Sequence, residues 1–473
     1  MDLHNLKIIS IFVLIITLPG FLGGCDMGTE GSYTNGDINI SQFELDVTDN
    51  SGELEFDIVA HSDEGIMSIK VESSKEDMSK EFNNESTAEF SGIIDAYPGT
   101  DEEINIEEIN ITILTDEGTK KNYSKEHYVR RYDRYTSNRD IELGMFYWPL
   151  MHDDSWDVIA VGTSLLGEYS LEPSNFDVEV ANRHIDQMQR SGIDRIMLLT
   201  QQSERDHQRV EYLKELDMFE ELEKFEIFYD LSKALQWEHD IEQDMKYYRD
   251  NAFSLDNYTE INGRPVMYFW WPHTAYWNED IRAELTKQYG GLAAFIDEIR
   301  STLTVNGVEP YMVGDFNNIG LRYKDGGLSE ELTEYIKSFD AVTNWTGNLE
   351  EGTLITWEEQ YEFIQETFQG YEKMSQDLDL DFLPAAFPGF DDRGNDHWGE
   401  DRLTPPDPDY FRKMLELADE YRSNSLMHVN TWSEWGEGSM VEPGYYHDHE
   451  AYPAYEEGYY GFDYLDEIKD FLQ

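Results

Sequence analysis

From about residue 141 to the end of the chain, short apolar runs alternate with longer amphipathic stretches, and this alternation limits the possible folds more than any other feature. It predicts strands that are each followed by a helix, and therefore a parallel sheet covered by helices. Eight runs have the length and composition of buried strands: Leu143–Trp148, Arg195–Thr200, Lys224–Leu231, Pro265–Trp271, Pro310–Phe316, Ala341–Trp345, Phe382–Phe387 and Leu426–Thr431.

Eight pairs of strand and helix over about 335 residues are the number expected for a (β/α)8 barrel. A doubly wound open sheet is the alternative, but the sequence lacks the glycine-rich phosphate-binding turn that would favour it. We therefore predict an α/β fold in which residues 132–473 form a TIM-like (β/α)8 barrel. In such a barrel, the chemistry takes place in the loops at the carboxyl ends of the strands.

The preceding segment, residues 38–131, has a different pattern, in which short alternating runs are separated by turn residues. Phe43–Val47, Leu54–Val59 and Ile66–Val71 have the alternation of half-buried strands. Six or seven such strands predict a small all-β, immunoglobulin-like sandwich without the disulfide. We expect this domain to be a spacer, with carbohydrate binding as the alternative role.

Residues 1–24 have the pattern of an export signal peptide, with an apolar run from Ile8 to Leu18. The sequence Leu-Gly-Gly-Cys that ends at Cys25 resembles the lipobox of bacterial lipoproteins, which implies lipidation of Cys25. The alternative is an uncleaved anchor, although the run is shorter than the ~20 residues that a spanning helix needs. With residues 25–37 as a flexible tether, we expect an extracytoplasmic lipoprotein anchored to the cell membrane.

The formal charge of −64, from 99 acidic residues against 35 Lys and Arg, is spread along the chain. Such a surface repels nucleic acid, because binding to phosphates requires clustered Lys and Arg. Its self-repulsion is strongest at low salt, so we expect an acidic, halophilic protein that works at high ionic strength. The single cysteine excludes an internal disulfide.

Acids, aromatics and turn residues are most densely combined at residues 431–443, after the last predicted strand. Glu434 and Glu437 lie three residues apart. Glu434 stands between Trp432 and Trp435, and Glu437 follows Trp435 by two residues. Cleavage of a glycosidic bond needs a proton donor and a second carboxylate, and sugar rings stack on flat apolar surfaces. Glu434 and Glu437 are therefore the candidate catalytic residues.

Aromatic and acidic side chains also occur at the ends of the other predicted strands. Aromatic rings can stack on pyranose faces, and carboxylates and arginine can hold sugar hydroxyls, although any single aromatic could instead pack in the barrel rim. A polysaccharide or glycan is thus the predicted partner. The candidate substrate-binding residues are Tyr147, Trp148, Asp230, Tyr268, Trp271, Asp315, Trp345, Asp391, Asp392, Arg393, Trp432, Trp435 and Glu442.

The sequence of Glu434–Gly438, together with Val441–Pro443, resembles the signature of glycoside hydrolase family 99 and its relatives, and Gly263–Tyr268 and Gly144–Pro149 add shorter likenesses. The resemblance implies a (β/α)8 barrel and retaining, endo-acting cleavage of α-mannosidic linkages. By motif position it implies that Glu434 deprotonates the 2-hydroxyl of the sugar. It also implies that Glu437 protonates the leaving oxygen.

Ser433 and Ser439 stand where the family usually has Asn and Thr, and these differences concern the identity of the sugar. Family 71-like α-glucanases have similar barrels, so a glucan is an alternative substrate. A non-catalytic carbohydrate-binding lipoprotein and a glycosyltransferase-like polysaccharide-assembly protein are the alternative functions.

We expect neither a cofactor nor a metal. His447-Asp448-His449, near Glu442 and Glu450, could bind a cation, and His397 lies beside Asp396. In a chain this acidic, a solvated loop is the preferred interpretation.

Overall fold

The computed structural model describes residues 33–34, 38–48, 50–96, 106–133, 135, 137–147, 162–166, 169–201, 203–237, 239–345, 356–391, 403–404, 407–446 and 458–473. The predicted export signal, most of the predicted tether and the histidines near residue 448 lie outside these residues. None of the helices in the described ranges is both long and apolar enough to cross a membrane.

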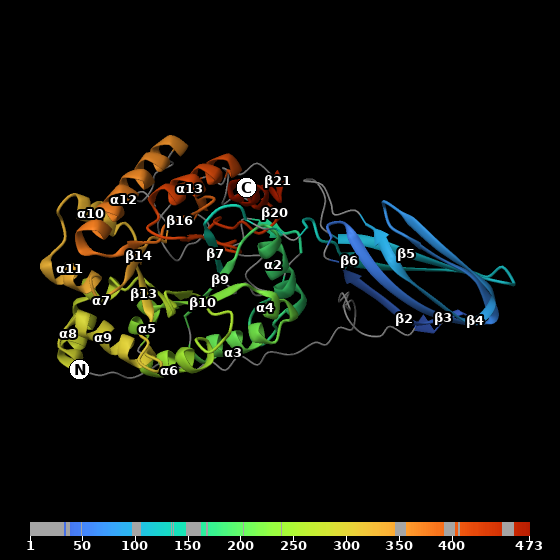
Figure 1. Cartoon of the computed structure of the whole chain (residues 1–473), viewed down its shortest axis with the longest axis horizontal. Coiled ribbons are helices and arrows are strands. Elements are labelled where there is room, and N and C mark those ends of the chain that lie inside the picture. The colour runs from blue at the N-terminus through green and yellow to red at the C-terminus, as the bar shows by residue number, and fades with distance from the viewer. Residues whose placement is uncertain are drawn as a thin grey trace, which may run out of the picture.

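The larger part of the described chain is a curled parallel sheet with helices on its outside (Figure 1). Neighbouring strands of this sheet pair in parallel register all along its path. Its main strands are β7 (Glu142–Tyr147), β9 (Arg195–Thr200), β10 (Lys224–Asp230), β12 (Arg264–Trp270), β13 (Tyr311–Asp315), β14 (Ala341–Thr343) and β19 (Leu426–Val429).

Residues 381–386 connect the two ends of this sheet. Their first part, β15 (Asp381–Phe382), pairs with β14, and their last part, β16 (Ala385–Ala386), pairs with β19. One short segment thus pairs with both ends of the curled sheet, an arrangement consistent with a TIM-like barrel. The predicted α/β fold with a parallel, barrel-like sheet is confirmed, and each of the eight predicted runs contains strand residues.

The helices of this domain follow the strands and cover their outer face. The helices are α2 (Val178–Arg190), α3 (Ser203–Lys214), α4 (Asp217–Glu221), α5 (Leu231–Gln236), α6 (Ile241–Asn251), α7 (Thr274–Trp277), α8 (Glu279–Tyr289), α9 (Leu292–Leu303), α10 (Ile319–Lys324), α11 (Glu330–Ile336), α12 (Trp357–Leu378), α13 (Pro408–Tyr421) and α14 (Asp463–Leu472). Two helices lie between β9 and β10, because the first of them ends at Lys214, and Gly290, with a positive φ of 92°, ends α8 before α9 begins.

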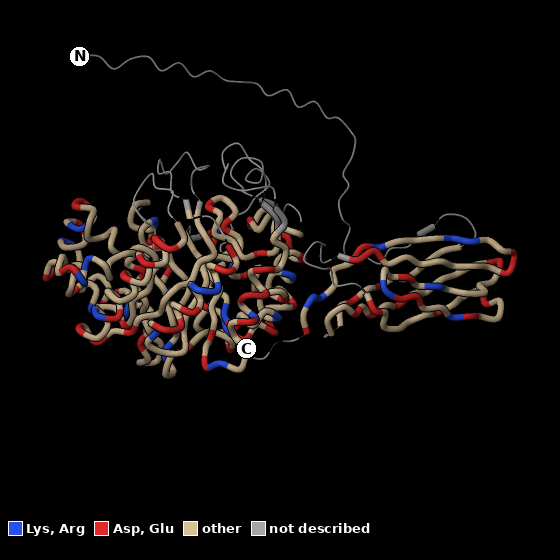
Figure 2. The backbone as a smooth tube through the Cα atoms, turned by 90° about the horizontal axis from the view of Figure 1, so that it is seen from above, with Lys and Arg blue, Asp and Glu red and all other residues tan. Residues whose placement is uncertain are grey.

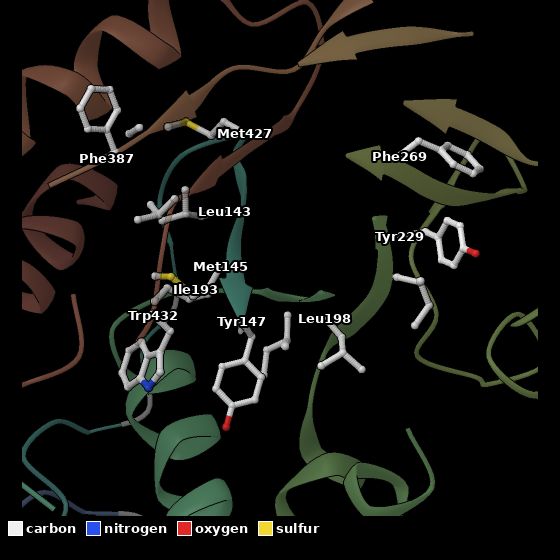
Figure 3. Packing of buried hydrophobic residues seen from close by; sticks show 14 of the residues in the cluster. Leu143, Met145, Tyr147, Ile193, Leu198, Tyr229, Phe269, Phe387, Met427 and Trp432 are labelled. Atoms are coloured by element: carbon white, nitrogen blue, oxygen red, sulfur yellow. The ribbon is translucent and has the colours of Figure 1, made fainter. Parts of the chain in front are cut away.

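Alternate residues of each barrel strand face two different cores. Phe146, Met197 and Phe228 belong to the cluster inside the barrel. Leu143, Met145 and Tyr147 belong to the cluster between the strands and the helices, and Figure 3 shows Tyr147 beside Trp432 there. This alternation decides which strand-end side chains face the interior of the barrel and which pack under the helices.

The N-terminal part is an antiparallel β domain, as expected, but its strands are longer than predicted. Leu54–Val59 and Ile66–Val71 lie in one strand, β3, because β4 continues to pair with β3 across the polar residues between them. The register of the pairing between β3 and β4 shifts between His61 and Ile66. The strands are β1 (Tyr33–Thr34), β2 (Ile38–Val47), β3 (Glu53–Glu72), β4 (Asp77–Asp95), β5 (Ile106–Thr115) and β6 (Lys120–Tyr128).

These six strands form one connected sheet rather than the two separate sheets of an immunoglobulin sandwich. The first half of β3 pairs with β2 and its second half with β5, while β4 pairs along the other edge of β3. Acidic residues are spread over this domain and over the barrel-like domain alike (Figure 2). The charge is therefore a property of the whole described surface rather than of one patch.

Candidate functional site

The segment after β19 folds back on itself and carries Glu434 and Glu437. The amide of Thr431 donates to the carbonyl of Ser439 at 2.7 Å, and the amide of Val441 donates to the carbonyl of Thr431 at 3.0 Å. Gly438 provides the turn with a φ of 61°, where a side chain would be strained. The amide of Trp432 donates to the carbonyl of Phe146 at 2.9 Å, which ties the segment to the carboxyl end of β7.

Glu434 and Glu437 are both half-buried at this position. Burial and the charge of Glu437 raise the pKa of Glu434 well above its ordinary value, and the amide of Gly436 opposes this only in part. One of the two carboxyl groups therefore keeps a proton at a pH at which the other is ionised. A proton donor beside a carboxylate is the arrangement that acid-base chemistry requires.

Five side chains occupy the last inward-facing position of their strands or the residues just beyond. They are buried, and they combine indole rings with acids and an amide. The centres of the Trp270 and Trp345 rings lie 5.1 Å apart. This layer, at the carboxyl ends of the strands, consists of Asp230, Trp270, Asp315, Trp345 and Asn430.

The two acids of this layer differ in their surroundings. Asp230 caps the start of α5 by accepting from the amide of Lys233, it also accepts hydrogen bonds from Gln201 and Ser232, and burial raises its pKa to about 6. Burial raises the pKa of Asp315 to about 8, although the amide of Asn317 donates to its Oδ1 at 3.0 Å. Asp315 is therefore a neutral acid at pH 7.

Several buried polar atoms at this end of the barrel have no hydrogen-bond partner among the described residues. They include Asp315 Oδ2, Asn430 Oδ1, Trp271 Nε1 and Asn344 Nδ2. Buried polar groups nearly always find a partner, so a concentration of unpaired ones suits a place that receives a polar ligand or water. Trp271 also has a positive φ of 48°, which is rare for a bulky side chain and typical of functional sites.

Replacing Asp315 by asparagine is expected to stabilise the protein at pH 7. The pKa of this acid is about 8 in the folded chain against 3.8 for an ordinary aspartate, so the folded state binds more protons between these values. Stability from this group therefore falls as the pH rises from about 4 to about 8, and asparagine removes that loss. The thermal midpoint of the variant should exceed that of the wild type by several degrees at pH 7. It should show no such gain at pH 4, and an equal gain at both pH values would contradict the assignment.

Other candidate residues lie away from the opening of the barrel. The Glu442 carboxylate is buried and accepts hydrogen bonds from Tyr169 and Trp435. His184 lies between Glu442 and Tyr147 and forms a hydrogen bond with each of them. Trp432 is buried in the same cluster. Tyr268 is buried inside the barrel, with its ring centre 5.8 Å from that of His428. The side chain of Asp391, and all of Trp148, Asp392 and Arg393, lie outside the described residues.

The sequence interpretation missed Tyr169, His184, His428 and Asn430. The burial of His184 could have been predicted from the sequence, because it stands four residues from both Val180 and Met188 on the apolar face of α2. His428 and Asn430 follow Leu426 at the inward period of β19. Among the described residues, no group of three side chains is arranged to hold a metal ion.

Searches against protein-family models and curated protein sequences find no match. Among solved structures, one described as a glycoside hydrolase-like protein matches with a TM-score of 0.52 and 16% identity, over 72% of this chain and 96% of that one. The two proteins share a fold. A GH99 endo-alpha-mannosidase from Bacteroides thetaiotaomicron matches with a TM-score of 0.49 and 16% identity, over 70% of this chain and 96% of the other.

Proposed function

We propose that the chain is a glycoside hydrolase whose acid-base pair is Glu434 and Glu437. The observation that carries this proposal is the pair itself: two half-buried carboxyl groups after β19, with the pKa of Glu434 raised by burial and by Glu437. The pair follows the carboxyl end of a barrel strand, where enzymes with this fold perform their chemistry. Indole rings and unpaired polar atoms at the same end of the barrel supply what a sugar needs for stacking and hydrogen bonding.

The motif resemblance supports a retaining mechanism with participation of the 2-hydroxyl. In this mechanism the single proton that the two glutamates retain lies on Glu437 when the sugar is bound. Glu434 is then ionised and takes the proton of the 2-hydroxyl while that oxygen attacks the anomeric carbon. Glu437 donates its proton to the leaving oxygen as the glycosidic bond breaks. Water then opens the resulting 1,2-anhydro sugar, with Glu437 as base and Glu434 returning the proton to the 2-oxygen, so the second inversion restores the configuration.

The same resemblance supports an endo-acting enzyme on an α-linked, α-mannan-like glycan. Anchoring through lipid on Cys25 would hold the enzyme at the outer side of the membrane, with residues 38–131 as the spacer. Ser433, in place of the family's Asn, is the position at which we expect sugar preference to differ.

A panel of glycans, assayed at high salt, tests this function against its two alternatives. The panel contains α-mannan, α-glucan and their reduced oligosaccharides, and products are followed by chromatography and anomeric NMR. We expect release of α-configured oligosaccharides from the mannan. Binding without release would instead support a carbohydrate-binding lipoprotein. Transfer from an activated sugar donor, without hydrolysis, would support the polysaccharide-assembly alternative.

A further inference from the structure

A buried hydrogen-bond network lies directly beneath the loop that carries Glu434 and Glu437. The Glu442 Oε2 atom accepts from the Tyr169 hydroxyl at 2.6 Å and from the Trp435 indole at 3.1 Å. Its Oε1 atom lies 3.0 Å from His184 Nε2, and His184 Nδ1 lies 3.1 Å from the Tyr147 hydroxyl. All five side chains are almost completely buried.

The protons of this network can be assigned from the donor and acceptor capacities of its members. A carboxylate oxygen accepts, so His184 donates from Nε2 to Glu442, which leaves Nδ1 to accept from the Tyr147 hydroxyl. Burial and the Glu442 charge raise the pKa of Tyr169 and of Tyr147 well above 10, so both stay protonated. The carboxylate thus receives three donors, which offsets the cost of burying its charge.

The four side chains that surround Glu442 in this network come from different parts of the chain. Tyr147 ends β7, His184 lies on α2, Tyr169 lies in the connection before α2, and Trp435 belongs to the loop itself. The carbonyl of Glu442 also accepts from the Tyr460 hydroxyl at 2.7 Å. Glu442 therefore joins the loop to rigid elements on both sides.

Trp435 stands between Glu434 and Glu437 in the sequence, so the position of its indole constrains the backbone that presents both carboxyl groups. The Trp435 side chain is fully buried, and its N–H donates to Glu442. A side chain locked by packing and by a hydrogen bond of this kind is what keeps reacting groups within a fraction of an ångström.

We propose that Glu442, His184 and Tyr169 are positioning residues, which hold Trp435 and thereby the carboxyl groups of Glu434 and Glu437. This role rests on the proposed hydrolase function. It differs from the substrate contact that the sequence suggested for Glu442 and Tyr147, since neither side chain has appreciable exposed surface.

Tyr169→Phe and Glu442→Gln test the role, with Tyr229→Phe as the matched control. The Tyr229 hydroxyl donates to the buried Asp244 carboxylate at 2.7 Å under α6, so its loss removes the same kind of bond away from the loop. We expect kcat to fall roughly tenfold for Tyr169→Phe and about 10²-fold for Glu442→Gln, with KM little changed. The control should keep its kcat.

A second readout does not need activity. Carbon-13 NMR of glutamate-labelled protein follows the titration of Glu434, whose signal is assigned with Glu434→Gln. When the loop is released, water reaches Glu434 and its raised pKa should fall in both test variants and stay unchanged in Tyr229→Phe. If the test variants keep the wild-type titration and kcat, the positioning role is wrong. If the wild type hydrolyses nothing while the titration shifts as expected, the positioning role stands and the hydrolase function fails.

Discussion

Replacing Glu437 by glutamine is expected to reduce kcat on the glycan substrate by about 10³-fold, within the range that general acid-base catalysis contributes. Glutamine keeps the shape of the side chain but has no proton to give to the leaving oxygen. Because Glu437 is half-buried rather than part of the packed core, the fold should be unaffected. Circular dichroism and the thermal midpoint check the fold, and reducing-end release gives kcat.

The identity of the leaving group separates the two glutamates. An aryl glycoside with a good leaving group needs no proton donor, so Glu437→Gln should recover much of its bond-cleavage rate on that substrate, whereas Glu434→Gln should not. Glu416→Gln is the matched control, because Glu416 is an exposed glutamate of α13. Near-normal hydrolysis by Glu437→Gln would overturn the assignment. If the aryl glycoside restored the cleavage rate of Glu434→Gln and not that of Glu437→Gln, Glu434 would be the proton donor and Glu437 the base.

The barrel could be predicted because its strands are short and apolar and are separated by clear helices. Because the strands are apolar on both faces, however, the sequence does not show which side chains face the barrel interior and which face the helices. Both faces of a parallel barrel strand are buried, so Leu143, Met145 and Phe146 are equally apolar. The sequence therefore could not show that Tyr147 points under the helices rather than into the barrel, and only the register of β7 against β9 decides it.

The site could be predicted in part for a similar reason. Glu434 and Glu437 were recognisable because a local motif carries them after a strand. Glu442 belongs to the same motif, but its orientation depends on His184 and Tyr169, which are more than 250 residues away in the chain. In an irregular loop no periodicity tells an inward from an outward side chain, so its role needed the tertiary structure.

Breaking the ion pair between Arg195 and Glu226 is expected to have the largest effect on stability. The two side chains are fully buried and face each other from β9 and β10, with Arg195 Nη1 2.5 Å from Glu226 Oε1. The guanidinium also donates to the carbonyl of Met427 at 2.9 Å on β19, so one side chain links three strands across the barrel interior. Glu226→Gln leaves the arginine charge buried without a counter-charge, which costs about 3–5 kcal/mol of unfolding free energy. Urea unfolding, followed by fluorescence, measures the loss.

Two comparisons decide whether the charge pair is responsible. Glu416→Gln breaks the exposed pair with Arg412 by the same substitution, and exposed pairs contribute about 0–1 kcal/mol. The double variant Arg195→Met with Glu226→Leu removes both charges, so it should recover a large part of the stability that Glu226→Gln loses. The recovery is expected to be incomplete, because methionine cannot donate to the carbonyl of Met427. A loss in Glu226→Gln no larger than that in Glu416→Gln would mean that water reaches Arg195 inside the barrel, and the interior would then not be the closed core that the strand packing forms.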